Sequence, residues 1–437
     1  MVTSSLTNVA PPWRRHGLLL LLTLLYTNTF IGRQIMAVMI EPIKYEFNAS
    51  DTAMGLVSGL AFAAVFALFG LGAGRMADRL PRTRILAACV LLWSATTVLC
   101  GFTTGFIVLV MARMLVAIGE SAVTPCSISM IADLYPVNRR AFAISCYSTA
   151  PTLAAIIAMS VGAWLVEHYG WRTGFIAVGI PASIIAIMMF LMREPARGTW
   201  DHPPAEPRAP LSLLATLQSL WAIKPYRYLI LAAAVSTLGT NAFAMWNATF
   251  LVRSHHLELQ QAGILAGVVG GGSAALGMLF SGWFTDRLIS AHPRWQLLIP
   301  QWGHLIGIAT MATYLLWPTE NSWILFGQRI PTAMIWCALN GFFAVWWVGP
   351  CFSMITRLVS PDSRAVAMAC QTVLVTLLGA GVGPLAVGAL SDLFIPTLLD
   401  ESLRYSLLLG CVSTAYAMVL LNNVARLQRQ AVAKGPI

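Results

Sequence analysis

The chain has 437 residues, of which 58% are hydrophobic and only 10% are charged. Soluble globular proteins carry about 25% charged residues, so this composition excludes a water-soluble domain and predicts a protein that faces lipid. The net charge of +10 is concentrated in short loops between apolar runs, which indicates membrane topology rather than nucleic-acid binding. The eight cysteines lie in or beside apolar runs without metal-binding spacing, so we predict packing roles for them.

Twelve apolar segments follow one another along the chain. They cover residues 17–39, 52–74, 85–102, 106–131, 141–166, 171–192, 227–252, 261–285, 295–317, 323–353, 364–391 and 402–424. Apolar runs of about 20 residues predict spanning helices rather than barrel strands, and the first run is too long to be the core of a signal peptide. We therefore predict an all-α membrane protein with twelve transmembrane helices.

Residues 193–226 interrupt this pattern with prolines and charged side chains. Such a stretch is typical of a linker. It separates residues 1–192, which we expect to form an N-terminal six-helix bundle, from residues 227–437, which we expect to form a C-terminal one. Within the linker, residues 212–222 predict a short amphipathic helix at the membrane surface.

Two internal repeats indicate that the halves are duplicated. The pattern Gly-x-x-x-Asp-Arg-Leu occurs at residues 74–80 and again at residues 282–288. A second pair of matching stretches covers residues 131–146 and 355–370. Halves related in this way meet at a central cavity near the middle of the bilayer, where transporters bind their substrates.

Basic residues are unevenly distributed between the two sides of the predicted membrane protein. Only Lys44, Arg172, Arg253 and Arg404 fall in loops on one side, whereas the loops of the other side hold most of the remaining lysines and arginines. Loops rich in these residues stay in the cytoplasm. We therefore expect a multi-pass protein of the cell membrane, inner or plasma, with both termini and the linker in the cytoplasm.

The twelve segments, the central linker and Gly-x-x-x-Asp-Arg after the second segment together resemble the major facilitator superfamily. Within this superfamily, the N-terminal half resembles the Spinster-like branch. The residues that carry this second resemblance are Ser50-Asp51-Thr52, Gly55-Leu56, Trp93-Ser94, Gly119-Glu120, Pro125, residues 132–136, Arg139-Arg140-Ala141, Gly170-Trp171-Arg172 and residues 193–198. The resemblance implies two pseudo-symmetric six-helix bundles that work by alternating access, and a lysolipid or sphingoid type of substrate.

The first segment departs from the Spinster-like pattern. That branch usually carries Asp-Arg there, and the resemblance gives the aspartate a part in proton coupling, whereas this chain reads Gly32-Arg33. The missing acid weakens the expectation of proton coupling and leaves uniport or exchange open.

Three charged residues lie inside apolar segments of the N-terminal half. Glu120 is near the middle of the fourth segment, Arg113 is two helical turns earlier on the same face, and Arg33 is in the first segment. Intramembrane charges are costly and mark functional sites by default. Two arginines against one carboxylate would attract an anionic substrate, and Glu120 is the one credible proton carrier. The alternative is an ion pair that only stabilises the bundle.

Other polar and aromatic residues of the segments are candidates for lining the same cavity. They are Tyr26, Asn28 and Thr124 in the N-terminal half and Asn241, Trp246, Asn247, Arg329, Asn340 and Gln371 in the C-terminal half. The aromatic residues can equally serve packing or the interfacial belt. Arg329, which we place in the tenth helix, can extend to the membrane surface instead.

The repeated loop motif predicts a cytoplasmic gate. Asp78 can accept hydrogen bonds from the start of the eleventh helix near Arg364, and Asp286 can do the same for the fifth helix near Arg140. The arginines of the loop can pair with Asp133 or with anionic lipids. The residues of this predicted gate are Gly74, Asp78, Arg79, Arg82, Arg84, Asp133, Arg140, Asp286, Arg287 and Arg364. The alternative is a role in topology and helix capping alone.

These features predict a secondary active transporter for an organic, anionic or amphiphilic solute of lysolipid type, with protons as a candidate co-substrate. The open alternatives are a symporter for small organic acids or sugar acids and a multidrug exporter. No residue set in the segments suits enzyme catalysis or metal binding, so we expect neither an enzyme nor a cofactor. The expected partners are the solute, protons and membrane lipids, without nucleic acid, and the expected state is a monomer.

Overall fold

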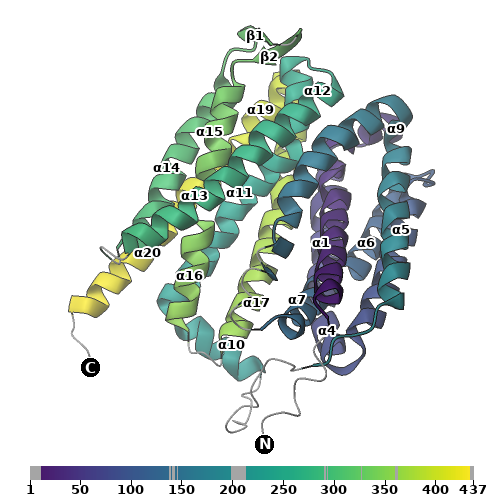
Figure 1. Cartoon of the computed structure of the whole chain (residues 1–437). Coiled ribbons are helices and arrows are strands. Elements are labelled where there is room, and N and C mark those ends of the chain that lie inside the picture. The colour runs from purple at the N-terminus through teal and green to yellow at the C-terminus, as the bar shows by residue number, and fades with distance from the viewer. Residues whose placement is uncertain are drawn as a thin grey trace, which may run out of the picture. The chain divides into compact units, whose positions relative to one another are not determined.

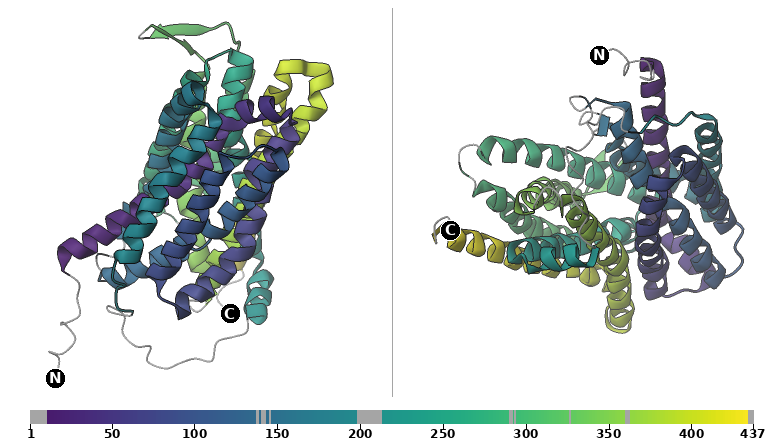
Figure 2. Two further views of the ribbon diagram at one scale, coloured as in Figure 1. Left: turned by 90° about the vertical axis from the view of Figure 1, so that its right-hand side faces the viewer. Right: turned by 90° about the horizontal axis from the view of Figure 1, so that it is seen from below.

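Figure 1 shows the computed structural model, which describes residues 11–136, 139, 143–144, 146–197, 213–289, 292, 294–325, 327–359 and 363–433. The chain forms two compact units. One comprises Met1–Ile43 and Ala61–Ala209, and the other comprises Lys44–Leu60 and Pro210–Ile437. Residues 44–60 therefore belong to the N-terminal half of the sequence but pack within the second unit. Inside each unit the helices run side by side (Figure 2).

Long apolar helices make up the first unit. They are α1 (Pro12–Gln34), the first part of α2 (Met36–Phe47), α4 (Ala61–Arg79), α5 (Arg82–Cys100), α6 (Phe106–Glu120), α7 (Val123–Leu134) and α9 (Ala150–Leu191). Pro12 begins α1, where its missing N–H costs nothing. Inside α1, the hydroxyls of Thr23, Thr27 and Thr29 donate to carbonyl oxygens four residues earlier, so these polar groups are satisfied without water.

Helix α9 contains two of the expected segments. Gly170 interrupts it with a φ of 81°, in the left-handed region that favours glycine. Figure 1 shows α9 turning back on itself. The sixth expected segment and the described part of the fifth are therefore helical and are joined by this turn.

The second unit holds the remaining elements. They are the last part of α2, α3 (Asp51–Gly55), η2 (Leu56–Leu60), α10 (Leu213–Ala222), α11 (Lys224–His255), α12 (Leu259–Ile264), η3 (Leu265–Gly271), α13 (Gly272–Ile289), α14 (Trp295–Leu316), β1 (Ser322–Leu325), β2 (Gln328–Pro331), α15 (Met334–Ala344), α16 (Val348–Leu358), α17 (Arg364–Leu374), η5 (Val375–Val382), α18 (Gly383–Leu398), η6 (Leu399–Glu401), α19 (Ser402–Leu407) and α20 (Leu409–Ala433). The short helix predicted in the linker is confirmed by α10.

Turns of π-helix interrupt three of the long helical stretches. They are η2 between α3 and α4, η3 between α12 and α13, and η5 between α17 and α18. The turn η2 begins 18 residues before the first copy of Gly-x-x-x-Asp-Arg-Leu, and η3 begins 17 residues before the second. The repeat of the sequence is therefore also an approximate repeat of local structure. Such turns often occur at functional sites. They mark places where these helices can bend.

The tenth expected segment is only partly helical, so the prediction of one helix over residues 323–353 was wrong at its start. Strands β1 and β2 form an antiparallel hairpin, with Trp323 opposite Ile330 and Ile324 opposite Arg329, and α15 begins only at Met334. Gly327, with a φ of 75°, supplies the left-handed backbone of the turn. The short apolar run in β1 fits a strand as well as a helix, and its period does not distinguish them.

Nine helical stretches among the described residues are long and apolar enough to cross a membrane. Two of them, residues 150–191 and 366–430, each hold two expected segments, and α14 provides the ninth expected one. Each of the twelve expected segments therefore contains helix. Large apolar side chains such as Ile107, Leu191 and Leu279 are more than two-thirds exposed on these helices (72%, 76% and 73%), which suits a surface that faces lipid.

Candidate functional site

Arg33 and Glu120 form an ion pair in the first unit. Arg33 is in the last turn of α1, and Glu120 is the last residue of α6. The Arg33 Nε donates to Glu120 Oε2 at 2.6 Å. The Glu120 side chain is fully buried, whereas 26% of the Arg33 side chain is exposed. The structure thus brings together two residues that the sequence assigned to one network, and it leaves the arginine as the accessible member.

Three phenylalanine rings surround the guanidinium of Arg33. Its Cζ lies 5.1 Å from the ring centroid of Phe30, 5.0 Å from that of Phe62 and 4.6 Å from that of Phe66. These distances are within the range of cation–π attraction, which holds a planar guanidinium well. Within the described residues, only the Nε of this guanidinium donates to a protein acceptor. The Arg33 side chain is therefore fixed in position and keeps donors available for a ligand.

Arg113 lies deeper than Arg33 in the same cluster. It is 1% exposed, and its Nη1 donates to the carbonyl oxygen of Gly32 at 3.3 Å. Its Cζ is 5.3 Å from the ring centroid of Phe62, so this ring contacts both arginines. Two guanidinium groups accompany one carboxylate, and the ionised cluster carries a net positive charge. An anion would be attracted to it.

Several buried polar atoms of the first unit have no hydrogen-bond partner within the described residues. They include Asn28 Oδ1, Arg113 Nε and Glu120 Oε1. Buried polar groups without partners are rare in proteins, and each calls for a water, an ion or a function. The second carboxylate oxygen of Glu120 is thus an acceptor that a proton, water or a ligand group can use.

Gly32 leaves space beside this carboxylate. A Cβ added at position 32 would lie 4.0 Å from Glu120 Oε1 and 3.4 Å from Val178 Cγ1, which are ordinary contact distances. The position of the acid that the Spinster-like resemblance leads us to expect is therefore directly beside Glu120. In this chain, Glu120 is the carboxylate that remains at this place.

The other N-terminal candidates differ in their relation to Arg33. Tyr26 stacks on Tyr147 with ring centroids 4.3 Å apart, and it contacts Phe30 edge-on at 4.9 Å. Because Phe30 also contacts Arg33, Tyr26 is continuous with the cluster. Asn28 is buried and Thr124 is half-buried, and in the described part of the chain neither one hydrogen-bonds to Arg33 or Glu120.

Two C-terminal candidates use their polar atoms within the second unit. Trp246 Nε1 donates to the carbonyl oxygen of Pro384 at 3.0 Å. Asn247 Oδ1 accepts a hydrogen bond from the Tyr314 hydroxyl at 2.7 Å, and its Nδ2 lies 3.8 Å from Cys337 Sγ. Both side chains are buried. These contacts favour packing roles for Trp246 and Asn247.

Three further C-terminal candidates lie in helices. Asn241 Nδ2 donates to the carbonyl oxygen of Thr237, one turn earlier, at 3.2 Å. Asn340 is 4% exposed in α15, and Gln371 is fully buried in α17. Both amide atoms of Gln371 lack a partner within the described residues. Gln371 is therefore the C-terminal candidate whose donor and acceptor remain available.

Arg329 does not lie in the tenth helix, contrary to the sequence prediction. It is an exposed residue of β2, and its Nε donates to Ser322 Oγ at 3.1 Å. Its Nη2 donates to the carbonyl oxygen of Thr319 at 3.3 Å. These bonds stabilise the hairpin, so the structure gives Arg329 a role at a surface turn rather than inside a helix.

Arg82, the first residue of α5, is the centre of the described part of the predicted gate. Its Nη1 donates to Asp133 Oδ2 at 2.5 Å and to Ser129 Oγ at 2.8 Å. Its Nε donates to Glu194 Oε1 at 2.9 Å, and its Nη2 to the carbonyl oxygen of Pro195 at 3.2 Å. This single arginine, only 2% exposed, therefore ties α5 to α7 and to the residues that follow α9.

The remaining residues of the predicted gate are less informative. Arg84 is exposed, and the Arg287 guanidinium lies 5.7 Å from the ring centroid of Trp283. The residues whose side chains lie outside the described part of the structure are Gly74, Asp78, Arg79, Asp286 and Arg364, and Arg140 lies outside it altogether. The expected contact of Asp78 with the eleventh helix stays a prediction.

Replacing Arg82 with methionine is expected to lower the free energy of unfolding by about 3 kcal/mol, because buried Asp133 and partly exposed Glu194 would lose the cation that they share. Thermal unfolding of the purified protein, followed by tryptophan fluorescence, measures this. Arg84→Met is the control, since it removes an exposed arginine two residues later. Equal melting temperatures for the two variants would contradict the assignment.

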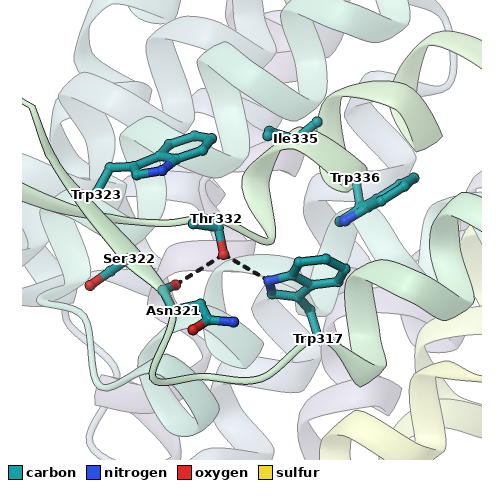
Figure 3. A pocket seen from close by; sticks show the side chains of 7 residues that line it. All are labelled: Trp317, Asn321, Ser322, Trp323, Thr332, Ile335 and Trp336. Carbon is teal, nitrogen blue, oxygen red and sulfur yellow. Dashed lines mark hydrogen bonds between the residues drawn. The ribbon is translucent and has the colours of Figure 1, made fainter.

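A separate hollow lies in the second unit beside the β-hairpin (Figure 3). It has a volume of about 360 Å³ and is lined by Trp317, Asn321, Ser322, Trp323, Thr332, Ile335 and Trp336. Trp317 Nε1 donates to Thr332 Oγ1 at 2.7 Å, and Thr332 Oγ1 donates to the Asn321 carbonyl oxygen at 3.2 Å. The hollow has no charged lining residue, so it lacks what an anionic solute needs. Its tryptophans suit a membrane interface.

The sequence matches the family model of the Major Facilitator Superfamily over residues 22–384. The chain belongs to this superfamily. This transporter is 29% identical over 402 residues to an MFS-type efflux pump of Mycolicibacterium smegmatis. The alignment covers 91% of this chain and 89% of the relative. It is 25% identical over 408 residues to the sphingosine-1-phosphate transporter SPNS2 of Danio rerio, in an alignment that covers 90% of this chain and 78% of the relative.

Solved structures agree with this assignment. The transporter matches a bacterial homolog of the human lysosomal transporter Spinster, in an inward-facing and occupied conformation, with a TM-score of 0.82 and 28% identity. The match covers 95% of this chain and 98% of the other. A nucleoside transporter, NupG, matches with a TM-score of 0.72 at 12% identity, which shows the fold alone. The predicted superfamily fold and the Spinster-like resemblance are both confirmed.

Proposed function

We propose that this transporter moves an amphiphilic organic anion across the cell membrane by alternating access, with Arg33 as the residue that binds the anionic group. The observation that carries this proposal is the partly exposed Arg33 guanidinium, held by three phenylalanine rings and by buried Glu120. The rings offer an apolar surface next to the cation. A solute with an anionic head and an apolar body matches both.

The relatives support this class of solute. Sphingosine-1-phosphate, named for the Danio rerio relative, combines a phosphate with a long apolar chain. A phosphate or carboxylate can accept two hydrogen bonds from one guanidinium. A small sugar acid would use the cation but not the phenylalanine rings, so the site favours an amphiphile over the alternative of an organic-acid or sugar-acid symporter.

Export is the second candidate, and one observation favours it. The relative from Mycolicibacterium smegmatis is an efflux pump, and it aligns over most of this chain. An exporter of apolar compounds would use the phenylalanine rings of the same site.

The uneven distribution of lysines and arginines supports an arrangement with both termini in the cytoplasm. We also propose that the protein acts as a monomer.

Counterflow in liposomes tests the proposal. Purified protein is reconstituted into liposomes that contain one unlabelled solute, and the entry of the same solute in labelled form is measured. The solutes tested in turn are a sphingoid phosphate, a lysophospholipid, a sugar acid and an uncharged lipophilic drug. We expect entry of the anionic amphiphiles. Entry of the sugar acid alone would assign the symporter alternative, and entry of the drug alone would assign the exporter. Thermal stabilisation by the same solutes separates binding from transport.

A further inference from the structure

Asp51, the first residue of α3, is fully buried and bound by two cations. Arg253 Nη1 donates to Asp51 Oδ2 at 2.7 Å, and Arg253 Nη2 donates to Oδ1 at 2.8 Å. Lys44 Nζ donates to Oδ1 at 2.5 Å, and Ser391 Oγ of α18 donates to Oδ2 at 2.7 Å. Four hydrogen bonds thus satisfy this carboxylate, and three of them come from charged groups, which make the stronger bonds.

The side chain of Asp392, the next residue of α18, binds backbone N–H groups at the start of α3. Its Oδ1 accepts a hydrogen bond from the Asp51 N–H at 2.9 Å, and its Oδ2 accepts from the Thr52 N–H at 2.7 Å. The Thr52 hydroxyl adds a third bond to Oδ2 at 2.6 Å. The first N–H groups of a helix have no partner within the helix. A carboxylate more than three hundred residues away in the sequence satisfies two of them here.

Glycines bring the two backbones into direct contact below this carboxylate network. A Cβ added at Gly388 would overlap the carbonyl oxygen of Asp51, and one added at Gly55 would lie 2.5 Å from the carbonyl oxygen of Pro384. A Cβ added at Gly59 would lie 2.7 Å from the carbonyl oxygen of Gly381. The contact therefore runs along α3 and η2 on one side and along η5 and α18 on the other.

Residues 44–60 carry this contact, although they belong to the N-terminal half of the sequence. The chain continues from η2 into α4, which lies in the first unit. The contact includes the π-helical turns η2 and η5, where a helix bends most easily. Lys44 and Arg253 keep exposed fractions of 24% and 12%, so water can reach the cations and replace their bonds.

We propose that Asp51 and Asp392 form a latch that holds α3 on α18, and that this latch opens and closes in each transport cycle. The inference rests on the alternating access proposed above. The latch consists of hydrogen bonds and ion pairs at a water-accessible end, which can be exchanged for bonds to water. Apolar side chains in a contact of the same extent could not form replacement hydrogen bonds with water when the contact opens.

A buried reporter cysteine tests the latch without any solute. Met54, fully buried one turn after Asp51, is replaced by cysteine in a protein whose eight native cysteines are serine or alanine. Modification by a membrane-impermeant maleimide is timed in right-side-out vesicles. We expect Asp392→Asn to raise the rate about tenfold, because it removes the charge from three hydrogen bonds. Asp51→Asn should act in the same direction.

Two further variants make the result decisive. Thr52→Val removes only the hydroxyl bond to Asp392 and keeps the side-chain shape, so it should raise the rate less and should fold even where Asp51→Asn does not. Glu401→Gln is the control, since it removes a 40% exposed carboxylate that pairs with Arg404. Unchanged labelling in folded Asp392→Asn and Thr52→Val, or an equal increase in Glu401→Gln, would overturn the latch.

The labelling rate does not depend on which solute is transported. Faster labelling in the latch variants, together with no counterflow of any tested solute by the wild-type protein, would support the latch and contradict the proposed substrate class. Counterflow of the anionic amphiphiles by the wild-type protein, together with unchanged labelling in the latch variants, would support the substrate class and contradict the latch. The two proposals therefore fail separately.

Discussion

Replacing Arg33 with alanine is expected to weaken binding of an anionic amphiphile by roughly ten- to a hundredfold, since hydrogen bonds to charged groups contribute about 1.5–3 kcal/mol each. The substitution removes the accessible cation of the cluster and leaves buried Glu120 without the donor that lies 2.6 Å away. Transport should fall in parallel. Solute-dependent thermal stabilisation measures binding, and liposome counterflow measures transport.

Arg33→Lys separates charge from shape. A lysine ammonium keeps the positive charge but cannot lie flat against Phe30, Phe62 and Phe66 as a guanidinium does. We expect it to retain part of the affinity for a small anion and to lose more of the affinity for an amphiphile. Arg172→Ala is the control, because Arg172 contacts Trp171 and the Thr103 carbonyl oxygen and lies outside the cluster. Wild-type affinity in Arg33→Ala would exclude Arg33 as the anion site.

The membrane fold and the charged pair could be predicted because both rest on strong local patterns. Long apolar runs have few structural solutions in lipid, and a single buried carboxylate in such a run needs a cation, which reduced the choice for Glu120 to the arginines of neighbouring helices. The phenylalanines around Arg33 could not be assigned in the same way. Phe62 and Phe66 are four residues apart and share a helix face, but apolar helices contain many such pairs.

The hairpin and the latch were missed for different physical reasons. Trp323 to Leu325 is a short apolar run, and its period fits a strand and a helix alike. Asp51 is ordinary in the first turn of a helix, where acidic residues are common. Asp392 lies inside α18, one residue beyond the expected segment 364–391, so the sequence pattern did not mark it as a buried charge. Their functional meaning comes from a contact between residues more than three hundred positions apart, and a single sequence holds no information on that pairing.

The second large effect is expected from Glu120→Gln, which should abolish the stimulation of transport by a proton gradient while counterflow continues. Exchange of solute for solute moves no net proton, so it does not need a protonatable group. Glutamine keeps the size of glutamate and can still accept a hydrogen bond from Arg33 through its amide oxygen. The cluster would then hold two arginines and no carboxylate, so affinity for an anion should be retained or increased.

The measurement compares uptake with and without an imposed proton gradient in liposomes, at equal amounts of folded protein. Glu167→Gln is the matched control, because Glu167 is an exposed carboxylate of α9 and its replacement should leave the gradient effect intact. If the proton gradient has no effect on the wild-type protein, the mechanism is uniport or exchange. This result would agree with the presence of Gly32 beside Glu120, at the position where the Spinster-like pattern has an acid. A gradient effect that persists in Glu120→Gln would place the proton carrier elsewhere, since it would show that the carboxylate beside Arg33 only compensates buried positive charge.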